Sequence, residues 1–118
     1  MTPAQIIKVT SVVALLAVGQ ILFKLGANRI QAGSLREMLV SLVLNPYVII
    51  GGLLYAVTVG LWILVLREVP ISRAYPFTAL AMIIVPLVGL VFFGEAFSWT
   101  LVIGGALLVA GIVVISLR

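Results

Sequence analysis

The sequence lacks cysteine and histidine altogether, and only three of its 118 residues are acidic. Without cysteine the chain can form neither a disulfide nor a thiolate metal site. Without histidine it lacks the side chain that most often binds metals and exchanges protons near neutral pH. It also has no aspartate-rich metal motif and no acid–base pair within an apolar run, so an enzyme is the least favoured class, and we expect no metal and no cofactor.

Charge is scarce as a whole: 8% of the residues are charged, 64% are hydrophobic and the mean hydropathy is +1.41. A soluble domain carries about 25% charged residues, so most of this surface must face lipid. A hydrocarbon core about 30 Å thick requires roughly 20 apolar residues per helix, which leaves room for four or five spans. The apolar runs are continuous rather than alternating, which excludes a small transmembrane β-barrel.

We therefore predict an all-α membrane protein whose single domain, residues 1–118, contains four transmembrane helices at about 5–27, 47–66, 74–94 and 99–117. The first apolar stretch is too long for a signal-peptide core, so it is interpreted as a retained span. Ser34 and Glu37 have the spacing of a capping box, and the apolar stripe that follows predicts a short interfacial helix before Asn45-Pro46. The connection 95–98 is so short that spans three and four must be antiparallel neighbours.

The positive-inside rule orients this bundle only weakly. One end carries Lys8, Arg67, Arg73 and Arg118, and the other end carries Lys24, Arg29 and Arg36. The count favours both termini in the cytoplasm, and dual insertion stays open.

Gln20 and Lys24 lie four residues apart and therefore share one face of the first span. Together they would form a polar patch inside the bundle that suits a phosphate or a carboxylate. In the alternative interpretation, Lys24 extends to the lipid head groups and Gln20 makes one interhelical hydrogen bond. Both interpretations stay open.

A second candidate is the turn between spans two and three. Arg67 and Arg73 could grip an anionic head group through bidentate hydrogen bonds, and Glu68 is able to pair with either arginine. In the alternative interpretation, the arginines are ordinary anchors of the positive-inside kind. Tyr75 is either a substrate contact or a residue of the interfacial aromatic belt.

Pro76 and Pro86 both interrupt span three. Pro86 has no N–H to offer the Met82 carbonyl, which predicts a kink at this position. A kinked helix can line a cavity or act as a gate, so both prolines are gating candidates. Membrane helices also simply tolerate proline, and that alternative is retained.

Span four presents a face with small residues at its contact points, made of Gly104, Leu108, Gly111 and Ile115. Small residues allow helix backbones to approach closely, which favours packing inside a membrane. The partner is either the same span of a second subunit or another helix of the same chain. We favour a dimer interface between subunits, because four short helices alone enclose little volume for a substrate.

No acidic residue lies within a predicted span, since Glu37, Glu68 and Glu95 fall in loops or at helix ends. Glu95 is expected at the surface. A site for an organic cation, or for proton-coupled exchange, normally needs a buried carboxylate. Because the net charge is +4 and the charge near the membrane interior is cationic, the sequence predicts an anionic, amphiphilic substrate and a site without a negative side chain.

Several stretches resemble the drug/metabolite transporter superfamily, in its small four-helix members. In chain order they are Gly19-Gln20 followed by Lys24, the run 61–66 with Trp62, Val69-Pro70, Ala74-Tyr75-Pro76, Gly94-Glu95 and the glycines of span four. The small multidrug-resistance branch carries a carboxylate midway along its first helix, where this sequence has Leu16. The closer resemblance is to the subunits of the aminoarabinose–phosphoundecaprenol flippase.

This resemblance implies a transporter of the bacterial inner membrane that flips an anionic polyprenyl-phosphate-linked sugar, as a homodimer or as a heterodimer with a related small subunit. In this hypothesis Lys24, helped by Arg67 and Arg73, neutralises the phosphate. The residues that contact the head group or line its path are Gln20, Trp62 and Tyr75. The expected partners are the lipid-linked substrate and membrane lipids, and no nucleic acid. Two rival functions stay open: an exporter of cationic metabolites or drugs, and a non-transporting accessory subunit of a membrane glycosyltransferase.

Overall fold

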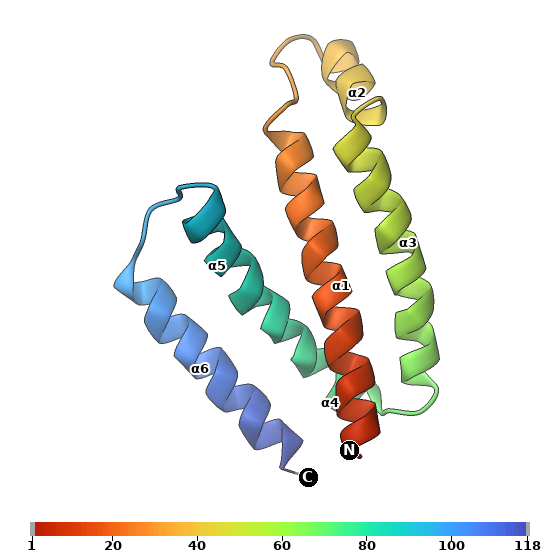
Figure 1. The fold of residues 1–118 in the computed structure, drawn as a ribbon, viewed down its shortest axis with the longest axis vertical. Coiled ribbons are helices and arrows are strands. Elements are labelled where there is room, and N and C mark those ends of the chain that lie inside the picture. Colours follow the sequence, from red (N-terminus) through yellow and green to blue (C-terminus); the bar gives the residue numbers. More distant parts are fainter. Residues whose placement is uncertain (1, 118) are drawn as a thin grey trace.

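The computed structural model describes residues 2–117, so Arg118, which the orientation count included, lies outside the described residues. Every regular element in this range is a helix (Figure 1). In chain order the elements are α1 Pro3–Ala27, α2 Leu35–Val43, α3 Pro46–Leu66, α4 Ile71–Ala74, the 3-10 helix η1 Tyr75–Leu80, α5 Ala81–Phe92 and α6 Trp99–Ser116. Four stretches are long and apolar enough to cross a membrane, namely α1, α3, the combined segment Ile71–Phe92 and α6. The predicted all-α fold with four spans and a short helix after the first is confirmed.

Side-chain caps fix where several of these helices begin. At α1, Thr2 accepts a hydrogen bond from the Gln5 backbone N–H while the Gln5 side chain accepts one from the Thr2 backbone. Ser34 accepts from the Glu37 backbone N–H at 3.3 Å, as the sequence predicts for the start of α2. Ser98 caps α6 in the same way. Each cap satisfies a backbone donor that the first turn of a helix leaves without a partner.

Helices α1 and α3 form the most closely packed pair, and glycine allows their approach. A Cβ atom on Gly51 would lie 3.0 Å from a ring carbon of Phe23 and 3.2 Å from Cβ of Leu22. Near the other end of the pair, a Cβ atom on Gly26 would lie 2.7 Å from Cγ2 of Val48. These contacts are so close that the two glycines determine how near the helices can lie.

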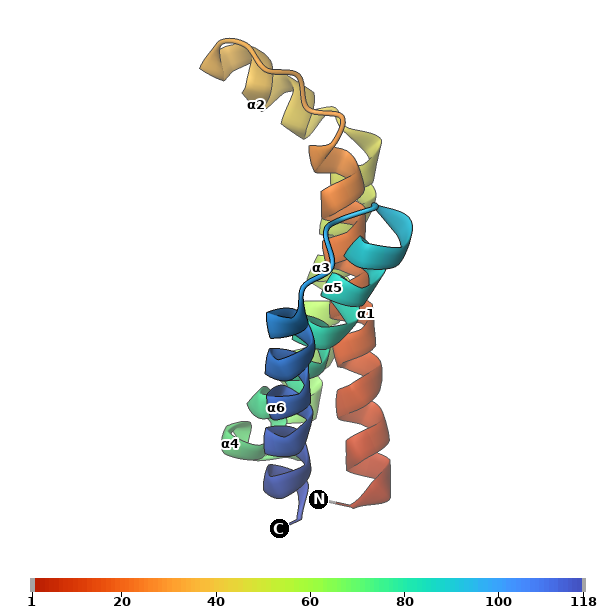
Figure 2. The ribbon, with the colours of Figure 1, turned by 90° about the vertical axis from the view of Figure 1, so that its left-hand side faces the viewer.

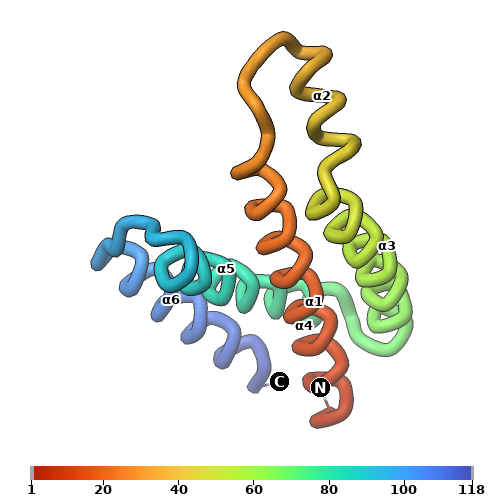
Figure 3. The backbone as a smooth tube through the Cα atoms, turned by 45° about the horizontal axis from the view of Figure 1, so that its top comes forward, coloured from red at the N-terminus to blue at the C-terminus, as the bar shows by residue number. Residues whose placement is uncertain are grey.

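The buried core lies at the end of the bundle where α1 begins and α6 ends (Figure 1). Its members are Val9, Val12, Val13, Val65, Val69, Ala74, Phe77 and Ile112. Ile112 is the only buried residue described for α6, which packs mainly against η1 and barely against α5. From this core, α5 and α6 diverge from α1 and α3, so the molecule is closed at one end and splayed at the other (Figure 3).

The third span changes helix type near Pro76, and the kink at Pro86 stays a prediction. The 3-10 helix Tyr75–Leu80 has Pro76 in its first turn, where the missing N–H is tolerated, and Thr78 Oγ1 donates to the Tyr75 carbonyl at 2.6 Å. In contrast, α5 continues through Pro86 as one α-helix. The change from 3-10 helix to α-helix therefore lies near one end of the third span, where this span joins the buried core, and not at the middle of the span.

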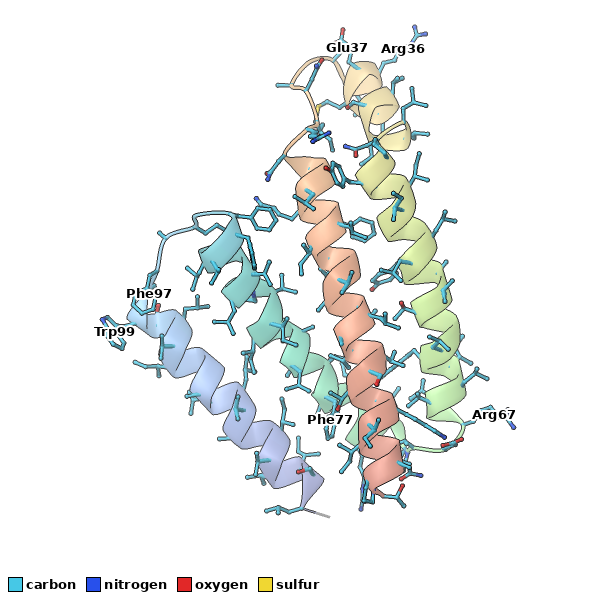
Figure 4. The ribbon with its side chains drawn as sticks, in the orientation of Figure 1. Arg36, Glu37, Arg67, Phe77, Phe97 and Trp99 are labelled. Carbon is cyan, nitrogen blue, oxygen red and sulfur yellow. The ribbon has the colours of Figure 1, made fainter. Side chains whose placement is uncertain are left out.

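Helix α2 projects from the splayed end of the molecule, beyond the start of α3 (Figure 2). None of its described residues is buried, and its large apolar side chains, such as Leu39 and Val43, are exposed. The start of α6 carries a second exposed apolar feature, because Phe97 and Trp99 pack edge to face 5.4 Å apart (Figure 4). Both features suit the boundary between lipid and water, where amphipathic helices and tryptophan are favoured.

Candidate functional site

A cleft of about 460 Å³ lies between α1 and α5 towards the splayed end of the bundle. The residues from α1 that line it are Gln20, Ile21, Phe23, Lys24 and Ala27, and those from α5 and the loop after it are Val85, Pro86, Gly89, Phe93 and Glu95. The cleft therefore contains one cationic and one anionic side chain on otherwise mostly apolar walls.

Lys24 and Glu95 face each other across this cleft. Lys24 Nζ lies 3.9 Å from Glu95 Oε1, and the two side chains are 47% and 50% exposed. This separation is longer than a charge-assisted hydrogen bond, which spans about 2.7–2.9 Å. The pair is therefore a loose ion pair without a direct hydrogen bond.

Two glycines place the Glu95 carboxylate in the cleft. Gly94 has a φ of +64°, which reverses the chain after α5, and the Glu95 backbone N–H then donates to the Gly89 carbonyl at 3.2 Å. Gly89 leaves room on the surface of α5, since a Cβ atom there would lie 3.0 Å from Glu95 Cδ and would clash with Oε2. The carboxylate is thus folded back over the last turns of α5 towards Lys24.

This arrangement corrects the expectation that the site contains no negative side chain. Glu95 is outside the helix, as the sequence indicates, but it lies against Lys24 in the cleft. The sequence contains a signal for it, since a glycine directly after a helix commonly reverses the chain, and the residue that follows is then directed back along the helix.

Gln20 lies in the cleft one helical turn from Lys24, as the spacing predicts. Within residues 2–117 its side-chain amide has no hydrogen-bond partner, and the residue is exposed to the cleft. An amide carries both donors and an acceptor. Gln20 therefore offers a neutral polar contact beside the charged pair.

The other cationic candidates lie at the opposite end of the bundle. Lys8 and Lys24 are sixteen residues apart on α1, which corresponds to about 24 Å along the axis and about 160° around it. At this end, Lys8 Nζ pairs with Glu68 Oε2 at 2.9 Å. Glu68 therefore has an ion-pair partner on α1, outside its own turn. Figure 4 shows Arg67 at this end, directed away from the bundle.

The remaining predicted contact residues also lie towards that end. Arg73 lies in the short helix α4, and Tyr75, at the start of η1, is 62% exposed. Trp62 of α3 is half-buried and packs against the core cluster. The structure thus brings Gln20, Lys24 and Pro86 together in one cleft and leaves Arg67, Arg73, Tyr75 and Trp62 outside it.

A second, almost wholly apolar groove of about 610 Å³ separates α5 from α6. Pro86 lines both this groove and the cleft. Of the predicted dimer-interface residues, Gly104 and Leu108 line the groove, while Gly111 is exposed and Ile115 is 37% exposed. A Cβ atom on Gly104 or Gly111 would meet no atom within 4 Å, so nothing in the described part of the chain packs on these small residues.

Comparison with known proteins places these features in a family. The model of the EamA-like transporter family matches residues 1–117. The chain is 33% identical over 110 residues to the probable 4-amino-4-deoxy-L-arabinose-phosphoundecaprenol flippase subunit ArnF of Sodalis glossinidius, covering 89% of this chain and 85% of that protein. It is 30% identical over 104 residues to the corresponding ArnE subunit of Hamiltonella defensa, covering 88% of each. No solved structure matches the chain. The chain belongs to the EamA-like transporter family, within the drug/metabolite transporter superfamily, and it is similar to the small flippase subunits of that superfamily.

Proposed function

We propose that the chain is a subunit of a dimeric flippase that moves a polyprenyl-phosphate-linked sugar across the bacterial inner membrane. The observation that carries this proposal is the cleft that holds Lys24 and Gln20 between α1 and α5. Its volume of about 460 Å³ falls within the range of small-ligand sites, about 300–1,000 Å³, and suits a monosaccharide phosphate. The names of the similar ArnF and ArnE proteins support the same class of substrate.

In this proposal the protein shelters only the head group, while the prenyl tail stays in the bilayer. An unpaired charge within hydrocarbon costs several kcal/mol, which is the barrier that a flippase must lower. Lys24 supplies a counter-charge to the phosphate, and the Gln20 amide hydrogen-bonds a phosphate oxygen or a sugar hydroxyl. Pro86 lies on the wall of the cleft, and Pro76 lies at the junction of the third span with the buried core. In this proposal α5 moves relative to α1 about these prolines, and the movement opens or closes the cleft to the head group.

The cationic residues at the other end act at the opposite membrane face. Arg67 and Arg73, with Tyr75 and Trp62 beside them, meet the phosphate where it enters or leaves the bilayer. Their end of the bundle is that of Lys8, which lies about 24 Å from Lys24 along α1 by the helix rise. The head group therefore passes from one cationic cluster to the other.

The second subunit packs on α6. Gly104 and Gly111 accept a close helix because no described atom lies against them, and Leu108 and Ile115 supply the apolar contacts between them. The partner is a second copy or a related small subunit, and the similarity to both ArnF and ArnE supports a pair of related chains.

A flipping assay in proteoliposomes tests the proposal with a fluorescent prenyl-phosphate sugar. Lys24→Ala should abolish translocation while expression and helix content remain those of the wild type. Arg36→Ala is the matched control, because it removes the same charge from the exposed helix α2, outside the cleft. Translocation by Lys24→Ala at the wild-type rate would disprove the role of the cleft.

The Glu95 carboxylate favours a second candidate, the export of a cationic metabolite, because it places a negative charge in the cleft. Uptake of a quaternary ammonium compound into the same proteoliposomes distinguishes the two functions. Robust uptake that Glu95→Gln abolishes, without flipping of the prenyl phosphate, would favour the exporter.

A further inference from the structure

A groove of about 650 Å³ lies between α1 and α3 at the closed end of the molecule. We infer that this α1–α3 groove binds one phospholipid with an anionic head group from the surrounding bilayer. The groove shares no residue with the cleft between α1 and α5, so the inference goes beyond the proposed function and does not depend on it. It includes Arg67 but not Arg73, so the phospholipid occupies only part of the cationic cluster that we propose for the transported phosphate.

The lining of the α1–α3 groove changes from charged to apolar along the bundle. On α1 the lining residues run from Lys8 through Ser11 to Leu15, a distance of about 10 Å by the helix rise. On α3, which is antiparallel to α1, they run inwards from Arg67 to Leu61. The charged end therefore lies where both helices reach the membrane boundary, and the apolar part extends towards the hydrocarbon. A phospholipid has the same order of polarity, with a polar head group at the boundary and apolar acyl chains below it.

The apolar part of the groove is a trough for an acyl chain. Val12 and Val65 are buried at its floor, with exposed fractions of 5% and 6%. Ile7 and Leu64 line it as well and are 66% and 54% exposed, so their apolar surface is left for lipid to cover. Because lipid tails are as apolar as leucine, the trough positions a chain without selecting the lipid. Selection therefore depends on the charged end.

The charged end of the groove contains two positive side chains, Lys8 and Arg67, and one negative side chain, Glu68, so its net charge is +1. Lys8 Nζ donates to Glu68 Oε2 at 2.9 Å and to Oε1 at 3.2 Å, so each of these two charges has a counter-charge. Arg67 is exposed and directed away from the bundle (Figure 4), and within residues 2–117 its guanidinium has no ion-pair or hydrogen-bond partner. A guanidinium binds a phosphate through two parallel hydrogen bonds. A lipid phosphate therefore supplies the counter-charge of Arg67.

This end suits an anionic head group better than a zwitterionic one. The ammonium of phosphatidylethanolamine requires a carboxylate, and the carboxylate of Glu68 already accepts two hydrogen bonds from Lys8. Phosphatidylglycerol has a phosphate and no cationic group, so its single negative charge matches the net charge of the groove. One basic residue at the membrane surface favours an anionic lipid by about fivefold.

Native mass spectrometry of the full chain in detergent tests the inference, by titration with phosphatidylglycerol or with phosphatidylethanolamine of the same acyl chains. The wild type should bind phosphatidylglycerol about fivefold more tightly. Arg67→Gln should lose this preference, whereas Glu68→Gln should increase it because the net charge of the groove rises. Arg36→Gln is the matched control, because it removes an arginine from the exposed helix α2, outside the groove, and should keep the preference.

A bulky side chain tests whether the lipid lies in the groove. Ser11 lies between the charged end and the trough, and its hydroxyl donates only to the Ile7 carbonyl of its own helix, so Ser11→Trp should fill the groove without unfolding the protein. Binding of phosphatidylglycerol should fall about tenfold. Thr10→Trp is the matched control, because Thr10 is the neighbouring exposed residue of α1, outside the groove, and this variant should bind like the wild type.

Three results would each overturn the inference: equal binding of the two lipids by the wild type, an unchanged preference in Arg67→Gln, or wild-type binding by Ser11→Trp. Displacement of phosphatidylglycerol by an equal amount of a short prenyl phosphate would also overturn it, because the groove would then belong to the transported lipid. The proposed flippase function fails in the flipping assay with Lys24→Ala instead, so the two failures are distinguishable.

Discussion

Asn45 links the end of α1 to the start of α3. Its Nδ2 donates to the Gly26 carbonyl at 2.8 Å while its Oδ1 accepts from the Tyr47 backbone N–H at 3.0 Å, and the residue is only 6% exposed. One buried side chain thus satisfies a carbonyl at the end of one helix and a donor at the start of the next. Such groups are costly to leave without a partner in a low-dielectric environment.

Asn45→Ala should therefore destabilise the protein by about 2 kcal/mol, the sum of a lost N-cap and an unsatisfied carbonyl. Unfolding in detergent, followed by far-UV circular dichroism, measures the effect. Asn28→Ala is the matched control, because Asn28 is exposed and follows α1 without a side-chain hydrogen bond among the described residues. Equal stability of the two variants would show that the link contributes nothing.

Adjacent glycines in α3 give a second stability prediction. A methyl group on Gly51 would press on the Phe23 ring and on Leu22, whereas a Cβ atom on Gly52 would meet nothing within 4 Å. Gly51→Ala should cost about 1–3 kcal/mol, as overpacking of a close interface does. Gly52→Ala should cost nothing and can stabilise the helix by up to about 1 kcal/mol, because alanine favours a helix more than glycine does. The same unfolding measurement compares the two variants. A loss of stability in Gly52→Ala as large as that in Gly51→Ala would contradict the packing argument, because nothing lies against its Cβ atom there and alanine favours the helix.

The sequence predicts the helices well because their causes are local. Runs of about 20 apolar residues determine the spans, and Asn45-Pro46 and Ser34 mark helix starts by cap chemistry that operates within three residues. The shared face of Gln20 and Lys24 follows from helix geometry alone, and the structure places both in one cleft.

The charge pairs are different, because they join segments far apart in the sequence. Lys8 and Glu68 are separated by 60 positions, and Lys24 meets Glu95 only because α5 returns beside α1 and Gly94 reverses the chain. A single sequence gives the charge of each residue but not its distance from another span. For this reason the sequence predicts a site with only positive charge, although its span order already places Arg67 and Arg73 at the opposite end of the bundle from Lys24.

The absence of native cysteine makes the membrane topology directly testable. Arg36 on α2 and Arg67 after α3 are exposed at opposite ends of the bundle (Figure 4). With both termini in the cytoplasm, an impermeant maleimide added outside spheroplasts should label Arg36→Cys and should not label Arg67→Cys. Partial labelling of both variants would indicate dual insertion. Complete labelling of both from the outside would contradict four spans.

The last prediction concerns the exposed face of α6. Gly111→Leu places a large side chain where the second subunit is proposed to pack, so it should weaken dimerisation about tenfold, equivalent to about 1.4 kcal/mol. Fluorescence energy transfer between labelled subunits in liposomes measures the association. Gly60→Leu is the matched control, because Gly60 is an exposed glycine of α3 with no atom within 4 Å of an added Cβ.

The control separates two explanations of a weaker dimer. A bulky residue on any lipid-facing glycine perturbs the helix to a similar degree, whereas only a residue at the interface removes the contact between subunits. Loss of energy transfer in Gly111→Leu alone therefore locates the partner on α6. If Gly60→Leu dissociates the dimer and Gly111→Leu does not, the subunits meet through α3, and the open face of α6 is covered by lipid.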